Sequence, residues 1–283
     1  MMKIVHWLFR PIPLRFLILR SLDHRLHFLP YTMRLKYGTI ERANYGHCLL
    51  QAAQLARKLG HACISAIEFG VAGGNGIVAL EMHAEHVRRE TGVKIAIYGF
   101  DTGKGLPEPL DYRDLPYLFK AGHFAMDQDR LRARLRSAQL VLGPVEETVG
   151  EFCHQENPPP IGFISFDLDY YSSTAAALKI FEAEHDYLLP RVACYFDDMV
   201  GGIDLAYNEF TGELLAIKEF NEAHEHVKVA PVQGLRFSGG RLPQLWHEQI
   251  FVTHLFRHPD YGRPILDHKE APLAERGSSH VRH

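Results

Sequence analysis

Residues 161–198 read IGFISFDLDYYSSTAAALKIFEAEHDYLLPRVACYFDD and contain two apolar runs that each end in a pair of aspartates. Short runs rich in Ile, Phe and Tyr are typical of buried strands. The segment between them, residues 172–188, has apolar residues at helical spacing. Strand, helix and strand in this order predict a parallel unit whose two strands end at the same edge of one sheet.

Four carboxylates would meet at that edge. Asp167 and Asp169 end the first run, and Asp197 and Asp198 end the second. Open α/β sheets bind ligands there, and like charges gathered so closely are costly unless a cation or a proton offsets them. All four are therefore candidate ligands of a hard divalent cation such as Mg²⁺. For Asp197 and Asp198 the alternative is a solvated turn before residues 201–202.

A second candidate site segment is rich in glycine, because residues 67–76 read IEFGVAGGNG. Glycine lets the backbone approach a ligand closely, and the helix start that follows offers free N–H groups to an anion. Asp101 ends the next apolar run, where an acid can accept hydrogen bonds from ribose hydroxyls. The candidate cofactor-binding residues are Glu68, Gly70, Ala72, Gly74, Asn75, Asp101, Thr102 and Asp167.

This pattern is common to nicotinamide and S-adenosylmethionine sites, and two details favour S-adenosylmethionine. Glu68 precedes the first glycine, where an acid suits the cofactor's ammonium group, and Gly70 and Gly74 are spaced G-x-x-x-G. Residues 74–79 also match the G-x-G-x-x-A of dinucleotide sites, but this match begins late, already at the helix. A glycine turn without a ligand is the third possibility.

The complete pattern predicts an α/β fold with a doubly wound, mostly parallel, seven-stranded sheet. Strands are expected at residues 64–71, 94–101, 139–145, in the two runs above, and at 227–232 and 249–256. Helices are expected at residues 44–59, 76–91, 127–136, 145–155, 172–188 and 208–224. No helix pattern separates the last two strands, so the last strand should be antiparallel. We expect an amino-terminal arm at 1–43, one domain at 44–257 and a polar tail, loop-like or disordered, at 258–283.

Composition limits the partners and the location of the protein. The net charge of −3 gives no bulk basic signal for nucleic acid. Four scattered cysteines suit reduced thiols in the cytosol, and no run of 18 apolar residues predicts a membrane span. The arginine-rich arm should pack on the domain or on a second subunit, or else lie on anionic lipid. His83 and His86, on the first crossover helix, are expected at the surface.

Four segments together resemble the macrocin O-methyltransferase family, which includes methyltransferases of macrolide, cephamycin and aminocoumarin biosynthesis. The first is IEFGVAGGNG, quoted above; the others read YGFDTGKGLP (98–107), DLDYYSST (167–174) and FDD (196–198). The similarity covers roughly residues 64–220, and four motifs in order are more specific than any one of them. It departs from the family at residues 102–105 and 122–124, and the arm and the tail match nothing familiar.

The resemblance implies a Rossmann-like class I methyltransferase fold, S-adenosylmethionine as methyl donor and magnesium-dependent O-methylation. It places Glu68, Gly70 and Gly74 beside the methionine part of the cofactor and Asp101 beside the ribose. The two aspartate pairs would supply metal ligands, with Asp167 or Asp169 as the catalytic base. Which of these two is base and which is ligand stays open.

The expected function is O-methylation of a sugar or glycosylated small molecule, within a natural product or a polysaccharide. The acceptor would be a hydroxyl with an oxygen neighbour. The protein is expected to be a cytoplasmic homo-oligomer whose arm can also contact a membrane surface. Two other classes remain: a nicotinamide-dependent oxidoreductase, for which no Tyr-x-x-x-Lys pattern is present, and a non-catalytic cofactor-binding protein. Hydrolase and NTPase motifs are missing from the sequence.

Overall fold

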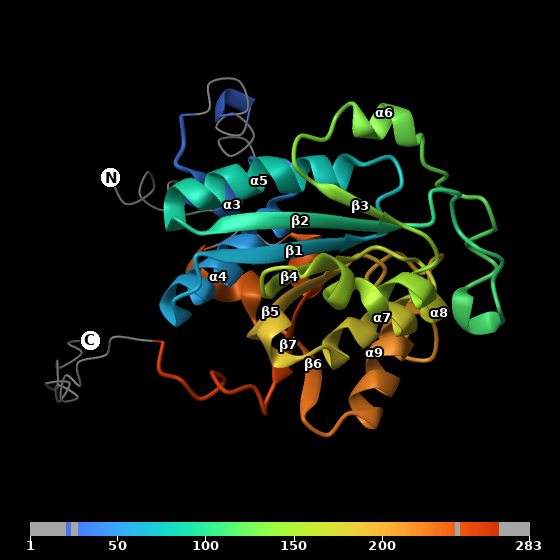
Figure 1. Ribbon diagram of the computed structural model, residues 1–283. Helices are drawn as coiled ribbons and strands as arrows, with labels where there is room; N and C mark the ends of the chain where they lie inside the picture. The colour runs from blue at the N-terminus through green and yellow to red at the C-terminus, as the bar shows by residue number, and fades with distance from the viewer. Residues whose placement is uncertain (1–20, 24–27, 241–243, 266–283) are drawn as a thin grey trace, which may run out of the picture.

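The sheet has seven strands in the order β3-β2-β1-β4-β5-β7-β6 (Figure 1). The computed structural model describes residues 21–23, 28–240 and 244–265 of the chain. β7 runs antiparallel to β5 and β6, and the other neighbouring strands are parallel. The strands are β1 (Cys63–Phe69), β2 (Lys94–Asp101), β3 (Gln139–Leu142), β4 (Ile161–Phe166), β5 (Leu188–Phe196), β6 (Val227–Pro231) and β7 (Ile250–Leu255).

This topology confirms the predicted α/β sheet with an antiparallel last strand, of the Rossmann-like type found in class I methyltransferases. The main error concerns β5. The apolar run predicted a strand from Ala193, whereas β5 begins at Leu188. Pro190 hides that start, since proline lacks the N–H that a ladder needs and is confined to edges and irregularities. It lies where the pairing between β4 and β5 shifts register.

Helices connect the strands and cover both sheet faces (Figure 1). They are α3 (Tyr31–Tyr37), α4 (Ala43–Leu59), α5 (Asn75–Thr91), α6 (Gln128–Arg132), α7 (Val145–Glu156), α8 (Tyr171–Ala177) and α9 (Gly212–Ala223). The single helix expected at residues 172–188 is shorter: α8 ends at Ala177, and two 3₁₀ turns, Leu178–Glu182 and His185–Tyr187, follow. Ala183 between these turns has an extended backbone, which interrupts the helix before β5.

Alternate residues of each strand feed two separate cores. Ala66 and Phe163 pack with α4 and α5, whereas Ile67 and Ile164 pack with α7, α8 and α9 on the opposite face. Side chains that alternate along a strand point to opposite sides of the sheet, so a strand covered on both faces is mostly apolar along its whole length. β4 shows this, since all of its residues are buried.

Four phenylalanines form a continuous row across the sheet at the carboxyl edge. Phe100, Phe69, Phe166 and Phe196 are register partners on β2, β1, β4 and β5. Their neighbouring ring centroids lie 4.7, 5.4 and 4.5 Å apart. We call them the phenylalanine row. The next residues along these strands are Asp101, Gly70, Asp167 and Asp197, so an apolar layer lies directly beneath the predicted acids.

The described part of the amino-terminal segment packs on α4 and α5. Tyr31 stacks on His86 with ring centroids 4.7 Å apart, and its hydroxyl lies 3.0 Å from Nδ1 of His83. His83 is fully buried, so its expected surface position is wrong; α3, which carries Tyr31, covers this face of α5. Residues 1–20 and 24–27 of the arm and residues 266–283 of the tail lie outside the described part. None of the described helices is both long and apolar enough to cross a membrane.

Candidate functional site

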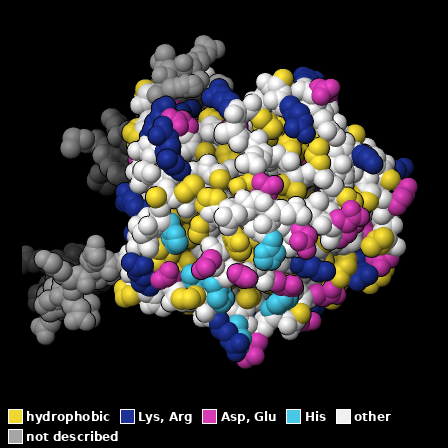
Figure 2. Space-filling model, viewed as in Figure 1, with side chains coloured by type: hydrophobic (Ala, Val, Ile, Leu, Met, Phe, Trp, Pro, Cys, Tyr) yellow, Lys and Arg dark blue, Asp and Glu magenta, His cyan; other side chains and the backbone are white. Residues whose placement is uncertain are grey.

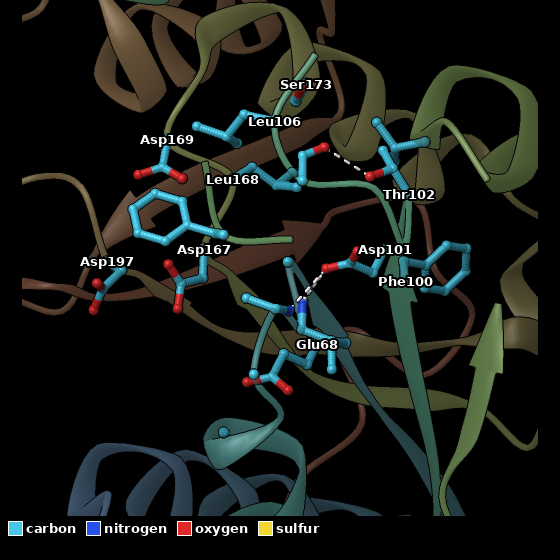
Figure 3. Close-up of a pocket in the computed structure, with 18 of the residues that line it drawn as sticks. Glu68, Phe100, Asp101, Thr102, Leu106, Asp167, Leu168, Asp169, Ser173 and Asp197 are labelled. Atoms are coloured by element: carbon cyan, nitrogen blue, oxygen red, sulfur yellow. Dashed lines mark hydrogen bonds between the residues drawn. The ribbon is translucent and has the colours of Figure 1, made fainter. Parts of the chain in front are cut away.

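A cavity of about 440 Å³ lies at the carboxyl edge of the sheet (Figure 3). Figure 3 shows Asp167, Asp169 and Asp197 on one side of it and Asp101 and Thr102 on the other. The sequence-predicted site residues that line it are Glu68, Gly70, Ala72, Gly74, Asn75, Asp101, Thr102, Asp167, Asp169 and Asp197. The cavity therefore brings together both sequence-predicted sites, with the exception of Asp198.

The turn after β1 requires its glycine. Gly70 has φ +85°, and a Cβ there would lie 1.7 Å from the carbonyl oxygen of Asp167. Ala72, two residues on, has φ +45°, a left-handed conformation that costs a non-glycine residue about 1–2 kcal/mol. Strain of this kind persists where the surroundings impose it, often at functional sites. The turn thus follows one path, close against the end of β4.

Asp101 fixes that turn from the adjacent strand. Its Oδ2 accepts the backbone N–H groups of Val71 (3.0 Å) and Ala72 (2.8 Å), and its Oδ1 accepts that of Gly103 (2.6 Å). Carboxylate oxygens have further lone pairs, so ribose hydroxyls can still be accommodated. The sequence suggested a ligand-binding role only; the structure adds a role in holding the turn.

α6 and the turn that follows it close the other side of the glycine turn. Arg134 donates from Nη1 to the carbonyl oxygen of Gly73 (2.7 Å) and from Nη2 to Oδ1 of Asn75 (2.9 Å). A Cβ on Gly74 would meet the Leu131 side chain at 2.1 Å. Asn75 is therefore oriented by an arginine that sequence reasoning did not connect with the site.

Glu68 lies buried at the base of the cavity, 1% exposed. Its Oε1 accepts a hydrogen bond from the Tyr45 hydroxyl (2.7 Å), which in turn accepts one from Ser165 Oγ (2.8 Å). Oε2 has no hydrogen-bond partner among the described residues. Burial raises the pKa of Glu68 to about 7, although Tyr45 and Arg42 both oppose the shift. A buried acid with one open oxygen is suited to a cationic ligand group.

Asp167 and Asp169 both face the cavity. Burial raises the pKa of each, to about 8 for Asp169, and the charges of Asp197 and Asp198 add to both shifts. Asp169 has φ +61°, so the chain leaves the strand path here under strain. Among the described residues, no group donates a hydrogen bond to either carboxylate.

The Asp197/Asp198 pair is divided. Asp197 lines the cavity, and its Oδ1 accepts a 2.5 Å hydrogen bond from Tyr195. Asp198 lies behind, 8% exposed, and accepts hydrogen bonds from the Tyr207 hydroxyl (2.8 Å) and the Asp169 N–H (3.2 Å). Burial raises the pKa of Asp198 to about 6, even though Tyr207 lowers it. The pair is thus not a solvated turn.

The types of donor atom in the cavity suit a metal ion, but their arrangement is not that of a metal site. In the parts of the chain described here, no group of three or more His, Cys, Asp or Glu side chains is arranged to hold one. The donors still suit a hard cation, because Asp167, Asp169 and Asp197 are oxygen ligands whose mutual repulsion it would relieve. These three would hold the ion, and the remaining lone pairs of Asp198 lie behind them.

Histidines lie elsewhere. Figure 2 shows histidine side chains gathered over β6, β7 and α9, where His224 stacks on Phe220 with centroids 4.0 Å apart and lies 3.3 Å from a Glu182 carboxylate oxygen. Of the described residues that line the cavity, none is a histidine. The proton acceptors of the cavity are therefore carboxylates.

Sequence reasoning missed several residues of the site. Gly143, Pro144, Val145 and Glu146 line the cavity, and the strand-end rule would have found them, since they follow β3. Arg42 and Tyr45 come from the turn before α4 and from α4 itself. No sequence motif marked these two, because only the packing of α4 on the sheet brings them to Glu68.

Comparison with models of known protein families gives no match, and comparison with curated proteins gives none. Among solved structures, CalS11, described as a calicheamicin methyltransferase, is 20% identical, with a TM-score of 0.49 over 86% of this chain and 93% of that one. The O-methyltransferase NovP is 11% identical, with a TM-score of 0.49 over 76% and 81%. An O-methyltransferase from Bacillus cereus, solved in complex with SAH, is 16% identical, with a TM-score of 0.37 over 89% and 94%.

These likenesses are weak, and the fold assignment therefore rests on the order and direction of the strands. The resemblance to the macrocin O-methyltransferase family remains a prediction from the four sequence motifs.

Proposed function

We propose that this protein transfers a methyl group from S-adenosylmethionine to an acceptor hydroxyl. The charge of the cavity carries the proposal. Its described lining contains one cationic side chain, Arg42, against six acids: Glu68, Asp101, Glu146, Asp167, Asp169 and Asp197. S-adenosylmethionine brings a sulfonium and an ammonium group, which acids attract. A nicotinamide dinucleotide brings two phosphates, which the same acids repel.

The lining gives each part of this cofactor a partner. The open Oε2 of Glu68 suits the ammonium group, and Asp101, on the neighbouring strand, suits the ribose hydroxyls. The glycine turn between them brings the backbone close to the ligand. A Cβ on Gly76 would lie 1.7 Å from Glu68 Oε1, so the acid occupies the space that a side chain would take.

Methyl transfer requires an oxygen in line with the sulfonium methyl and a group that removes its proton. Asp167 or Asp169 is the proposed proton acceptor, since no described donor competes for the lone pairs of either carboxylate. Asp167, Asp169 and Asp197, which line the cavity, would bind a divalent cation, with Asp198 behind them. The chemistry supplied by that cation would be a lowered pKa for the acceptor hydroxyl and a fixed orientation for a neighbouring oxygen.

The acceptor is proposed to be a sugar or a glycosylated small molecule. Two segments at the carboxyl edge, residues 102–126 and 199–211, are joined by a hydrogen bond from the Tyr117 hydroxyl to the carbonyl oxygen of Leu205 (3.1 Å). They carry half of the exposed large apolar side chains of the described chain: Leu110, Tyr112, Tyr117, Phe124, Ile203 and Phe210. Apolar and aromatic side chains beside carboxylates suit a ligand with hydroxyls and apolar faces.

Calorimetry with S-adenosylmethionine and with NADH, each with and without MgCl₂, tests the function. We expect S-adenosylmethionine to bind and NADH not to bind, with methyl transfer then detected on a panel of free and nucleotide-linked sugars. NADH binding alone would replace the proposal with an oxidoreductase. S-adenosylmethionine binding that is unaffected by Mg²⁺, together with magnesium-independent methyl transfer, would remove the metal from it.

A further inference from the structure

Arg42 is the cation of the acid-rich cavity. It lies just before α4, in the segment that the sequence assigned to a packing arm, and its φ of +46° is left-handed. L side chains rarely adopt this conformation, so the surrounding structure must impose it. The result is a guanidinium at the cavity wall.

The Arg42 guanidinium is near several acids but forms no ion pair with them among the described residues. It lies over the Tyr45 ring, 5.1 Å from the centroid, and Nη1 donates a long 3.4 Å hydrogen bond to the Tyr45 hydroxyl. Among the described residues it forms no ion pair within 4 Å. Arg34, by contrast, is paired with Asp23 at 3.1 Å.

Electrostatics keep this arginine charged. Burial lowers the pKa of Arg42, but Tyr45, Glu68, Asp167 and Asp197 together raise it above its usual value. The planar guanidinium has five donors in a fork that matches a carboxylate, and one of them is used on a neutral phenol. The Arg42 guanidinium therefore has donors available to bind an anionic group of a ligand in the cavity.

The cofactor proposed above supplies that anion. Its methionine moiety has an ammonium and a carboxylate on the same carbon, so the partners of these groups must be neighbours. Glu68 and Arg42 are linked through one atom, the Tyr45 hydroxyl, at 2.7 and 3.4 Å. Because the other charged side chains of the described lining are acids, a carboxylate without a cation would be repelled there.

We propose that Arg42 binds the α-carboxylate of the methionine moiety while Glu68 binds its ammonium, so that the turn before α4 completes the cofactor site. This inference rests on the proposed function. A simpler role would be neutralisation of the acids. In that case loss of Arg42 would leave discrimination for the carboxylate unchanged and would strengthen the binding of any cation.

The test compares S-adenosylmethionine with its decarboxylated form, which lacks only the carboxylate. Calorimetry on the full chain would use the wild type, Arg42→Gln, Arg42→Lys and a control, Arg132→Gln, at an exposed position of α6. We expect Arg42→Gln to weaken S-adenosylmethionine binding roughly 10- to 100-fold, the strength of a charge-assisted pair. Binding of the decarboxylated form should be equal to or tighter than in the wild type. Arg42→Lys should fall between, and Arg132→Gln should match the wild type.

Three results would be informative against the inference. Equal weakening of both ligands would mean that Arg42 supports the cavity only. Unchanged S-adenosylmethionine binding would mean that the carboxylate has another partner. If Arg42→Gln does not fold, the wild type still decides, because equal affinity for the two ligands after correction for their charge by a salt titration would refute carboxylate recognition. Failure of the wild type to bind S-adenosylmethionine at all would instead refute the proposed function.

Discussion

The two ends of the cavity treat their carboxylates differently. At the glycine-turn end, Glu68 accepts a hydrogen bond from Tyr45, and Asp101 accepts three from backbone N–H groups. At the other end, the carboxylates of Asp167 and Asp169 accept none from the described residues. A carboxylate held by donors keeps its position when a ligand arrives. A buried carboxylate without donors has a pKa raised by burial, and its free lone pairs can take up a proton or a cation.

Removing the unheld acids should have the largest effect. We expect Asp169→Asn and Asp167→Asn each to slow single-turnover methyl transfer roughly 10²- to 10⁴-fold, the contribution of a positioned general base. S-adenosylmethionine affinity should change less than about threefold for Asp169→Asn, because charge-assisted contacts at the other end remain. The exposed Asp186→Asn serves as control. Unchanged rates in both variants would rule out either acid as the base. A wild type that binds S-adenosylmethionine but transfers no methyl group would favour a non-catalytic cofactor-binding protein.

The held acid Glu68 should make the ligand-free protein less stable as pH rises. Its folded pKa of about 7 exceeds the ordinary 4.5, so its contribution to stability is complete below about pH 4.5 and is lost as pH rises through 7. At about 1.4 kcal/mol per pKa unit, the complete loss is roughly 3.5 kcal/mol, of which about 2–3 kcal/mol falls between pH 5 and pH 8. Glu68→Gln should remove this part of the decrease in the free energy of unfolding between pH 5 and pH 8.

Chemical denaturation without ligand at the two pH values measures that difference. Glu184→Gln, at an exposed position, should behave as the wild type. If Glu68→Gln showed the same decrease as the wild type, the pH dependence would have to come from other groups, such as Asp169 and Asp198, whose pKa values are also raised.

Loosening the hold on Glu68 should have the smallest effect of the three. Tyr45→Phe removes the donor to Glu68 and the acceptor for Ser165, and loss of one hydrogen bond costs about 1 kcal/mol. We expect S-adenosylmethionine affinity to fall roughly 3- to 10-fold, while 5′-methylthioadenosine, which lacks the amino-acid part, binds as before. Tyr171→Phe, which breaks a tyrosine–carboxylate bond with the exposed Glu219, should change neither. Equal losses for both ligands would point to general damage to the cavity.

The sequence predicts the strands well and their ends less closely, since the strands expected at 64–71 and 139–145 end at Phe69 and Leu142. The bounds of Lys94–Asp101 agree to the residue, and three of the four strand-end aspartates line the cavity with Asp101. The reason is physical: a strand buried on both faces is mostly apolar, so the polar residues that follow it mark its approximate end. β1 is an exception, since Glu68 lies within it. Pro190 shows the limit, since a proline inside a strand conceals it.

Contacts made by tertiary packing were beyond sequence reasoning. Arg42, Tyr45 and His83 lie in segments with no motif, and their burial depends on which helix face meets the sheet or α3. Asp197 and Asp198 look equivalent in the sequence, yet one lines the cavity and the other lies behind it. Adjacent residues at a strand end diverge in direction, and the pattern of residue types does not say which one turns inward.

The phenylalanine row has a consequence for how ligands arrive. Aromatic rings beneath the acids exclude water on that side, so the field of the carboxylates is not screened there and its lines emerge mainly through the open mouth. Clefts lined by one sign of charge over low-dielectric walls concentrate counter-ions and raise association rates by roughly 10- to 1,000-fold at low salt. The phenylalanine row would thus do more than pack the sheet: it would increase the rate at which cationic ligands reach the acids of the cavity.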